Sequence, residues 1–300
     1  MFNGTMTQCI GNLSKLKSLT QTRLRNLDIS NAEISDTFPN WFLEQIPKLS
    51  NLNVSHNNFH GVLPDLSSKS STFKSIDLSF NHFNGSLPIL PPNGSVVDLS
   101  SNKISGYNEF FGSIPSHLCR LADLQVSDLS LNKISGGMPK CVNNLTAMIQ
   151  VDSEFDSAFL LHYIRRFESA FVTWKGKDAE YINSLNLVML IDLLSNNLVG
   201  DVPAEISSLV MLVGSNLSRN NLSGFLPPNI ERLRSLDFLD FARNHFSGGI
   251  PTSVSQLDQL GVLDLSYNNL SGKIPQSIHL RNPELCGLPL TKACSEDEMA

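Results

Sequence analysis

Residues 263–275 read Leu263-Asp264-Leu265-Ser266-Tyr267-Asn268-Asn269-Leu270-Ser271-Gly272-Lys273-Ile274-Pro275, and variants of this pattern recur along the whole chain. The copies align on an asparagine seven residues before a proline, as in Asn268 and Pro275. These anchor positions are Ala32, Asn57, Asn81, Asn102, Asn132, Asn196, Asn220, Asn244 and Asn268. Their spacings are 25, 24, 21, 30, 64, 24, 24 and 24 residues, which predicts a stack of similar coils. Two copies are irregular: Ala32 replaces the asparagine, and extra residues separate Asn102 from Pro115.

Each position of the pattern has a physical role. Alternate apolar residues such as Leu263 and Leu265 point into the coil from a short strand. The asparagine amide satisfies main-chain groups where the backbone turns, Gly272 allows the following bend, and the proline begins the return path. The expected fold class is therefore an α/β repeat. It is a leucine-rich-repeat solenoid with a parallel β-sheet on the concave face, short 3-10 turns and loops on the convex side, and one non-repeat island.

The composition and the motifs argue against several kinds of function. The chain has 22 basic and 28 acidic residues, a net charge of −6, and no basic stripe that would indicate nucleic-acid binding. Because it has no phosphate-binding loop, kinase motif, nucleophile elbow or zinc-ligand spacing, we expect no enzyme activity, no cofactor and no metal. A column of strand aspartates is interpreted as part of the repeat rather than as an acid–base or metal site. Its members are Asp77, Asp98, Asp128, Asp192, Asp240 and Asp264.

The two ends of the sequence are informative about location. Met1 to Gly11 has neither the basic start nor the apolar core of a secretory signal, and no apolar run approaches the ~20 residues of a membrane span. Residues 2–7 match residues 270–275, so the chain begins inside a repeat. We therefore expect a fragment or a truncated gene product.

Nine Asn-x-Ser/Thr sequons suggest an extracellular glycoprotein, although a repeat rich in asparagine and serine also generates sequons by chance. Glycans at Asn53 or Asn216 would block part of the concave face, and Asn221 and Asn269 belong to the repeat pattern itself. The predicted glycosylation sites are Asn3, Asn12, Asn84, Asn93 and Asn144.

Four of the five cysteines are candidates for disulfide bonds. A bridge between Cys286 and Cys294 would tie the chain over the end of the core, which suits an oxidising compartment. Cys119 and Cys141 follow the prolines of consecutive coils and would meet on the convex side; the alternative is two buried thiols.

The form Leu-Ser-Gly-x-Ile-Pro resembles the plant extracellular type of leucine-rich repeat. The ending from Arg281 to Leu290, followed by Cys294, resembles the C-terminal cap of plant receptor-like proteins and receptor-like kinases. The stretch from Phe171 to Tyr181 resembles the island of receptor-like proteins. This resemblance implies a protein at the extracellular side of the plasma membrane, with one span outside this chain and no kinase, which signals by pairing with a receptor kinase. The implied domains are repeats at 1–145, an island at 146–187, repeats at 188–280 and a cap with an acidic tail at 281–300.

The island is rich in aromatic residues. Five of them, Phe155, Phe159, Tyr163, Phe167 and Phe171, follow a four-residue spacing that fits either one side of a strand or a drifting helical stripe. The composition of Phe171 to Trp174 favours a strand. The aromatics either form the core of the island or contact a ligand. Trp174, Lys175 and Gly176 are candidate binding residues, and the last two match the Lys-Gly motif of the family.

Outward-facing columns of the concave sheet supply the remaining candidates. Variation concentrates in the positions one residue before and one residue after the anchor. From these columns the candidate binding residues are His56, Phe80, His82, Arg219, Arg243, His245 and Tyr267. Arg219 and Arg243 are one coil apart and would clamp a carboxylate, as a similar arginine pair does in plant receptor kinases that bind small peptides; the alternative is two solvated arginines.

The predicted function is ligand recognition in the ectodomain of a plant receptor-like protein, in defence or development. The ligand would be a peptide, protein or glycan, and the partner a receptor-kinase co-receptor; nucleic acid is not expected. The alternatives are a secreted leucine-rich-repeat inhibitor of a microbial cell-wall enzyme, against which the island argues, and a non-functional truncated paralogue.

Overall fold

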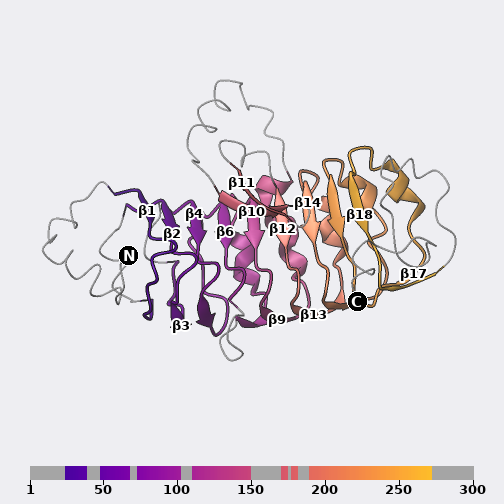
Figure 1. The fold of residues 1–300 in the computed structure, drawn as a ribbon. Helices are drawn as coiled ribbons and strands as arrows, with labels where there is room; N and C mark the ends of the chain where they lie inside the picture. Colours follow the sequence, from indigo (N-terminus) through magenta and orange to yellow (C-terminus); the bar gives the residue numbers. More distant parts are fainter. Residues whose placement is uncertain are drawn as a thin grey trace, which may run out of the picture. The chain divides into compact units, whose positions relative to one another are not determined.

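A computed structural model describes residues 24–38, 48–67, 73–102, 110–149, 170–174, 177–181 and 189–271. The chain divides into two compact units, unit 1 (Met1–Gly136) and unit 2 (Gly137–Ala300). In each unit, short parallel strands lie side by side as the rungs of a main sheet (Figure 1). This arrangement confirms the leucine-rich-repeat solenoid expected from the period.

The main sheet of unit 1 takes one three-residue strand from each coil. The strands pair in parallel register, so that Leu52 lies beside Ile76 and Ile76 beside Val97. These middle residues are at most 3% exposed and form one wall of the core. In spatial order the strands are β1 (Asn26–Asp28), β2 (Asn51–Asn53), β4 (Ser75–Asp77), β6 (Val96–Asp98) and β8 (Val126–Asp128).

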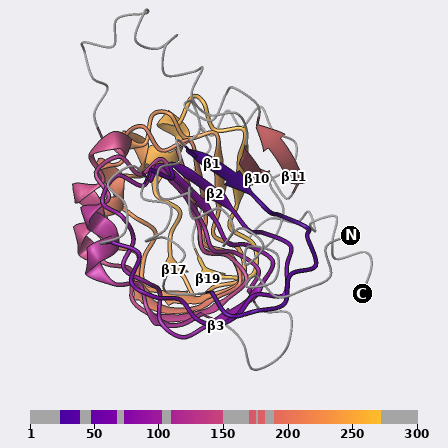
Figure 2. The ribbon, with the colours of Figure 1, turned by 90° about the vertical axis from the view of Figure 1, so that its left-hand side faces the viewer.

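A second run of strands follows the anchor asparagines, and the sequence pattern did not predict it. In unit 1, β3 (His60–Val62) pairs with β5 (His82–Asn84), and β7 (Phe111–Ser113) pairs with β9 (Lys133–Gly136). Along the stack, the main sheet, this second sheet and the 3-10 turns occupy three sides of the coils (Figure 2). The 3-10 turn η3 (Ser116–Arg120) lies in unit 1.

Unit 2 has the same plan. Its main sheet contains β12 (Leu190–Asp192), β14 (Gly214–Asn216), β16 (Phe238–Asp240) and β18 (Val262–Asp264). In the second sheet, β13 (Asn197–Asp201) pairs with β15 (Asn221–Ser223), and β17 (Ser247–Gly248) pairs with β19 (Asn269–Leu270). The 3-10 turns are η4 (Lys140–Asn144), η5 (Thr146–Met148), η7 (Ala204–Ser208), η8 (Ile230–Arg232) and η9 (Thr252–Gln256). The predicted 3-10 turns opposite the main sheet are therefore confirmed.

The bend glycines lie in the second sheet and have the role that the pattern assigned to them. Gly248 has a φ of +77°, and a Cβ added there would lie 2.6 Å from Cδ1 of Phe225. Only glycine accommodates both this backbone and the close approach of the preceding coil.

The described part of the predicted island contains the 3-10 turn η5 at its start and an antiparallel hairpin. β10 (Ala170–Trp174) pairs with β11 (Lys177–Tyr181), with Ala170 opposite Tyr181. The strand predicted at residues 171–174 is therefore confirmed. The aromatics at 155, 159, 163 and 167 lie outside the described residues, and the domain boundaries stay predictions.

Stacked phenylalanines from successive coils fill part of the core of unit 1. Phe59, Phe83 and Phe110 come from successive coils and are essentially unexposed. The Phe59 and Phe83 rings are stacked at 6.1 Å, and the Phe83 and Phe110 rings at 6.4 Å. Phe38 contacts both Phe59 and Phe83 edge-on at 6.3 Å. The core is thus continuous from coil to coil, as a repeat architecture requires.

The anchor asparagines connect each coil to the preceding one. The Asn244 Nδ2 donates to the Leu217 carbonyl at 2.9 Å and lies within hydrogen-bond distance of the Phe241 and Ala242 carbonyls, both at 3.2 Å. Its Oδ1 accepts the Leu222 N–H at 3.0 Å. Asn57, Asn81, Asn102, Asn220 and Asn268 make corresponding bonds. One buried amide therefore satisfies main-chain groups of two coils.

The strand aspartates close the turn that follows each main strand. The Oδ1 of Asp98 accepts the Ser100 N–H at 2.9 Å, and the Oδ1 of Asp240 accepts the Ala242 N–H at 2.9 Å. Asn53 and Asn216 make the same bond with their amide oxygens. Because asparagine serves equally well, the column is structural, as interpreted from the sequence. Among the described residues, no group of three metal-binding side chains is found.

Three carboxylates lie side by side in unit 1. Asp98 pairs in register with Asp77 on one side and with Asp128 on the other. Burial raises the pKa of the Asp98 carboxyl well above its usual value, and the negative charges of Asp128 and Asp77 raise it further. Burial also raises the pKa of Asp77. The fold therefore places the carboxylate of Asp98 between two like charges in a buried part of the sheet, where its ionised form is unfavourable.

Replacing the Asn244 anchor tests the connection between coils. Asn244→Ala leaves the buried Leu222 N–H without its acceptor and removes one of the two donors of the Leu217, Phe241 and Ala242 carbonyls. We therefore expect the free energy of unfolding to fall by about 3 kcal/mol. Urea unfolding followed by circular dichroism measures it. Asn197→Ala, at an exposed position of β13, is the matched control and should change it by less than about 0.5 kcal/mol. Equal effects of the two substitutions would contradict the role given to the anchor.

Replacing Asp98 tests the cost of the buried charge. Because its pKa is raised in the folded state, that state binds the proton more tightly than the unfolded chain. The free energy of unfolding therefore falls as the pH rises from the usual carboxyl pKa through the raised one. Asp98→Asn cannot ionise, so near pH 7.5 it should be more stable than the original chain by about 1 kcal/mol.

The stability difference should shrink as the pH is lowered towards 4, which thermal unfolding at several pH values would measure. Asp258→Asn, at an exposed position, is the control and should show no such pH dependence. An advantage of Asp98→Asn that stays constant with pH would rule out the charge explanation.

Candidate ligand-binding face

The residue before each anchor asparagine has a left-handed backbone conformation. His56, Phe80, Ser101, Leu131, Ser195, Arg219, Arg243 and Tyr267 have φ between 51° and 56°. This conformation costs about 1 kcal/mol or more for residues other than glycine, and here main-chain bonds between coils hold it. The Arg219 N–H donates to the Ala242 carbonyl, and the Arg243 N–H to the Ser266 carbonyl. These eight residues form what we call the turn column, at the end of the main strands.

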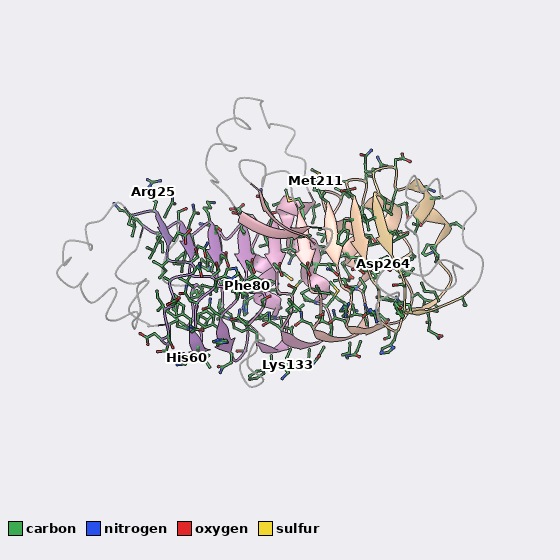
Figure 3. All side chains as sticks on the ribbon, in the orientation of Figure 1. Arg25, His60, Phe80, Lys133, Met211 and Asp264 are labelled. Carbon is green, nitrogen blue, oxygen red and sulfur yellow. The ribbon has the colours of Figure 1, made fainter. Side chains whose placement is uncertain are left out.

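The turn column brings His56 and Phe80 together in unit 1. Their rings are stacked with centroids 4.2 Å apart and planes at 10°. His56 is exposed and Phe80 is half-buried. In Figure 3, Phe80 lies between the main strands and the side that carries His60 and Lys133. This stack is a flat aromatic surface at the edge of the main-sheet face.

His82 and His245 have a different position from the one expected. His82 is the first residue of the second-sheet strand β5, and His245 precedes β17. Their N–H groups donate to the Phe59 and Leu222 carbonyls of the preceding coils. The column after the anchor therefore starts the second sheet, and these histidines flank the turn column instead of belonging to the main sheet.

Arg219, Arg243 and Tyr267 form an exposed cluster in unit 2, which we call the arginine–tyrosine cluster. They come from three consecutive coils whose strands β14, β16 and β18 pair in register. The Arg243 Cζ lies 4.1 Å from the centroid of the Tyr267 ring, which is a cation–π contact. The spacing of the repeat predicted that the two arginines are neighbours. It gave no indication that the Tyr267 ring contacts Arg243.

A carboxyl group lies beside this cluster. Asp240 is half-buried on β16, between Asn216 and Asp264 in register. Burial raises the pKa of Asp240 to about 6; the negative charge of Asp264 adds to the rise, and the positive charge of Arg219 opposes it. The protonation of the Asp240 carboxyl therefore depends on the charge of the arginine–tyrosine cluster.

The described sequons differ in exposure. Asn144 is exposed at the end of η4, while Asn84 and Asn93 are half-buried. Asn3 and Asn12 lie outside the described residues. The amide oxygens of Asn53 and Asn216 each accept a serine hydroxyl at 2.7 Å, so these two sequons are engaged in the turn. Glycosylation at the five predicted sites stays a prediction.

The remaining candidates are placed as follows. Cys119 and Cys141 are both disulfide-bonded in the structure, and their pairing with each other stays a prediction. Cys286, Cys294, Lys175 and Gly176 lie outside the described residues, and Trp174 ends β10. Within the described ranges, no helix combines the length and the apolar character of a membrane span.

Comparison with known proteins gives matches in sequence. The leucine-rich-repeat family model matches residues 48–69, 216–233, 235–257 and 259–280. Receptor-like protein EIX2 of Solanum lycopersicum is 34% identical over 129 residues, which is 42% of this chain and 12% of that protein. Receptor-like protein 7 of Arabidopsis thaliana is 31% identical over 123 residues, which is 41% of this chain and 12% of that protein. The matches thus span only a small part of these relatives.

Solved structures show the same fold at lower identity. The TDR receptor superposes with a TM-score of 0.69 at 22% identity, over 98% of this chain and 46% of that one. The ectodomain of the Arabidopsis thaliana receptor kinase GASSHO1/SCHENGEN3 gives 0.63 at 23% identity, over 92% and 30%. The Leptospira interrogans protein LIC12759 gives 0.60 at 22%, over 90% and 55%. Since a bacterial protein is among them, these superpositions establish the fold alone.

The repeat pattern, the stacked parallel strands and the matched relatives agree with one another. The chain has the leucine-rich-repeat fold, and its similarity to plant receptor-like proteins, inferred from the repeat and the cap, is confirmed by the relatives that its sequence matches.

Proposed function

We propose that this chain is part of the ligand-recognition ectodomain of a plant cell-surface receptor-like protein. It binds a peptide, protein or glycan and signals, in defence or development, through a partner receptor kinase. It lies on the extracellular side of the plasma membrane and acts as a binding protein rather than an enzyme. The likeness to plant receptor-like proteins supports the class, and the arginine–tyrosine cluster is the observation that carries the proposal.

The cluster suits an anionic group because of how its two arginines are held. Neighbouring strands in a sheet are about 4.8 Å apart, so the Arg219 and Arg243 backbones lie within the span of one carboxylate and its hydrogen bonds. The Tyr267 ring covers a face of the Arg243 guanidinium, whereas a carboxylate is bound by the N–H groups at its edge. Stacking on Tyr267 therefore restricts the conformation of the Arg243 side chain, and the N–H groups at the edge of its guanidinium can still bind a carboxylate.

A peptide ligand is supported by the kind of structure that the chain resembles. The GASSHO1/SCHENGEN3 ectodomain was solved in complex with CASPARIAN STRIP INTEGRITY FACTOR 2, and PEPR1, with a TM-score of 0.53, in complex with AtPEP1. A peptide with a free C-terminus carries the carboxylate that two arginines recognise. The hairpin β10–β11 falls within the predicted island, and an island favours this proposal over a secreted inhibitor.

Substitution in the cluster tests the binding role. A pool of N-acetylated octapeptides with free C-termini is selected on the secreted chain, and the enriched peptides are measured by calorimetry. Arg243→Ala should weaken their binding by ~1–3 kcal/mol, because hydrogen bonds to a charged group are lost. Arg232→Ala removes an exposed arginine from η8 and should leave the affinity unchanged.

The same pool with amidated C-termini should not be enriched on the secreted chain. Equal affinity of the Arg243 variant and the original chain, or equal enrichment of the amidated pool, would remove the arginine pair from the proposal.

Disulfide mapping tests the extracellular location. When the chain is expressed through a plant secretory pathway and digested without reduction, we expect a peptide in which Cys119 is linked to Cys141. Reduction of this disulfide should lower the midpoint of unfolding, because closing a loop of this size contributes roughly 3 kcal/mol to the stability of the folded chain. A thiol at either position in the secreted protein, detected by alkylation and mass spectrometry, would contradict this prediction.

A further inference from the structure

One coil of unit 2 departs from the usual turn at the carboxyl next to the arginine–tyrosine cluster. In most coils a serine stands two residues after the strand carboxyl or amide. The Ser79 hydroxyl donates to the Oδ1 of Asp77 at 2.7 Å, and the Ser218 hydroxyl donates to the Oδ1 of Asn216 at 2.7 Å. At the corresponding position after Asp240 the chain has Ala242, which offers only its backbone N–H. Asp240 therefore has the Ser218 hydroxyl of the preceding coil but none from its own coil, whereas Asp77 is stabilised by both Ser79 and Ser55.

The neighbours of Asp240 also favour its neutral form. On β18, Asp264 lies beside it in register and carries a like charge. On β14, the Asn216 amide group is directed towards Asp192, 3.5 Å away, and the Ser218 hydroxyl is bonded to Asn216. The nearby positive groups are Arg219 after β14 and Arg243 in the coil of Asp240 itself, with His245 two residues further along. The charge of Asp240 is thus opposed by burial and by Asp264. It is favoured by the Ala242 N–H, by the Ser218 hydroxyl and by the positive charge of Arg219.

We propose that Asp240 takes up a proton when an anion binds to the Arg219–Arg243 pair, so that the pair binds anions more tightly at mildly acidic pH. An anion on the arginines cancels the positive charge that keeps Asp240 ionised. Conversely, protonation of Asp240 removes a negative charge that repels the anion, and the two effects are equal by linkage. The raised pKa of Asp240, about 6, sets the range in which this exchange takes place. The inference rests on the arginine pair proposed above as an anion site.

Inorganic sulfate is the test probe, because its charge does not change between about pH 5 and pH 7.5. Its affinity for the chain is measured at constant ionic strength across this range by calorimetry. Moving one charge close to the site should strengthen sulfate binding threefold to tenfold at the acidic end, from a Coulomb estimate of roughly 1 kcal/mol. Repeating the titration in buffers of different ionisation enthalpy should show proton uptake on binding near pH 6.5.

Two variants built from the chain's own repeat separate Asp240 from other groups. Asp240→Asn copies Asn216 in the same column, so it should fold, bind sulfate as tightly as the acidic form at every pH, and take up no proton. Ala242→Ser copies Ser218 and Ser266 and restores the hydroxyl donor. It should lower the pKa of Asp240, and the pH dependence of sulfate binding should move to lower pH.

His245→Gln is the control for the histidine near the cluster, because histidine is the residue type most often responsible for pH-dependent binding near neutrality. Proton uptake should survive in it. Sulfate binding that does not vary with pH, or a pH dependence that persists in Asp240→Asn, would overturn the coupling and leave the arginine pair intact. Sulfate binding that is absent, or that is the same in an Arg219→Ala/Arg243→Ala double variant, would overturn the anion site itself and the coupling with it.

Discussion

A buried asparagine amide holds each coil to its predecessor, and the geometry of the binding face depends on this bond. In Asn220, for example, the Nδ2 donates across to the Leu193 carbonyl and lies close to the Leu217 and Ser218 carbonyls of its own turn. Its oxygen accepts the Leu198 N–H. Without Asn220 the Leu198 N–H would be buried without an acceptor and each of the three carbonyls would lose one donor, which costs more than most surface contacts contribute. The bond therefore fixes both the spacing of the coils and the shape of the turn.

The fixed turn explains why the residue before the anchor has a left-handed backbone. The residue stands between the end of the main strand and the amide that must reach the preceding coil, and its own N–H is bonded to the following coil, as for His56 and Arg243. The backbone is the same whether the side chain is histidine, phenylalanine, leucine or arginine. The fold therefore does not restrict which side chain occupies a position of the turn column. The side chains that contact one another are set by the residues of neighbouring coils.

The regular part of this structure was predictable from the sequence because it repeats. Leu263 and Leu265 are buried, and Ile230 and Leu233 close the core from the 3-10 side, as the period requires. The second sheet was not predicted, because its strands are short, follow the anchor directly and contain the bend glycine. The left-handed column was also missed, since no residue type marks it. The pairs His56–Phe80 and Arg243–Tyr267 depend on side-chain conformations that spacing does not determine.

The coil of Asp240 shows how a departure from the repeat acquires chemical meaning. Aspartate and asparagine are interchangeable as acceptors of the turn N–H, so the structure tolerates either at this position. They differ in charge, and the serine two residues later is one of the hydroxyl donors that stabilise a charge there, as Ser79 is for Asp77. Ala242 removes that hydroxyl in the coil that also carries Arg243. A substitution that is neutral for the turn is therefore not neutral for the neighbouring arginines, because the buried carboxyl and the exposed guanidinium groups share one electrostatic environment.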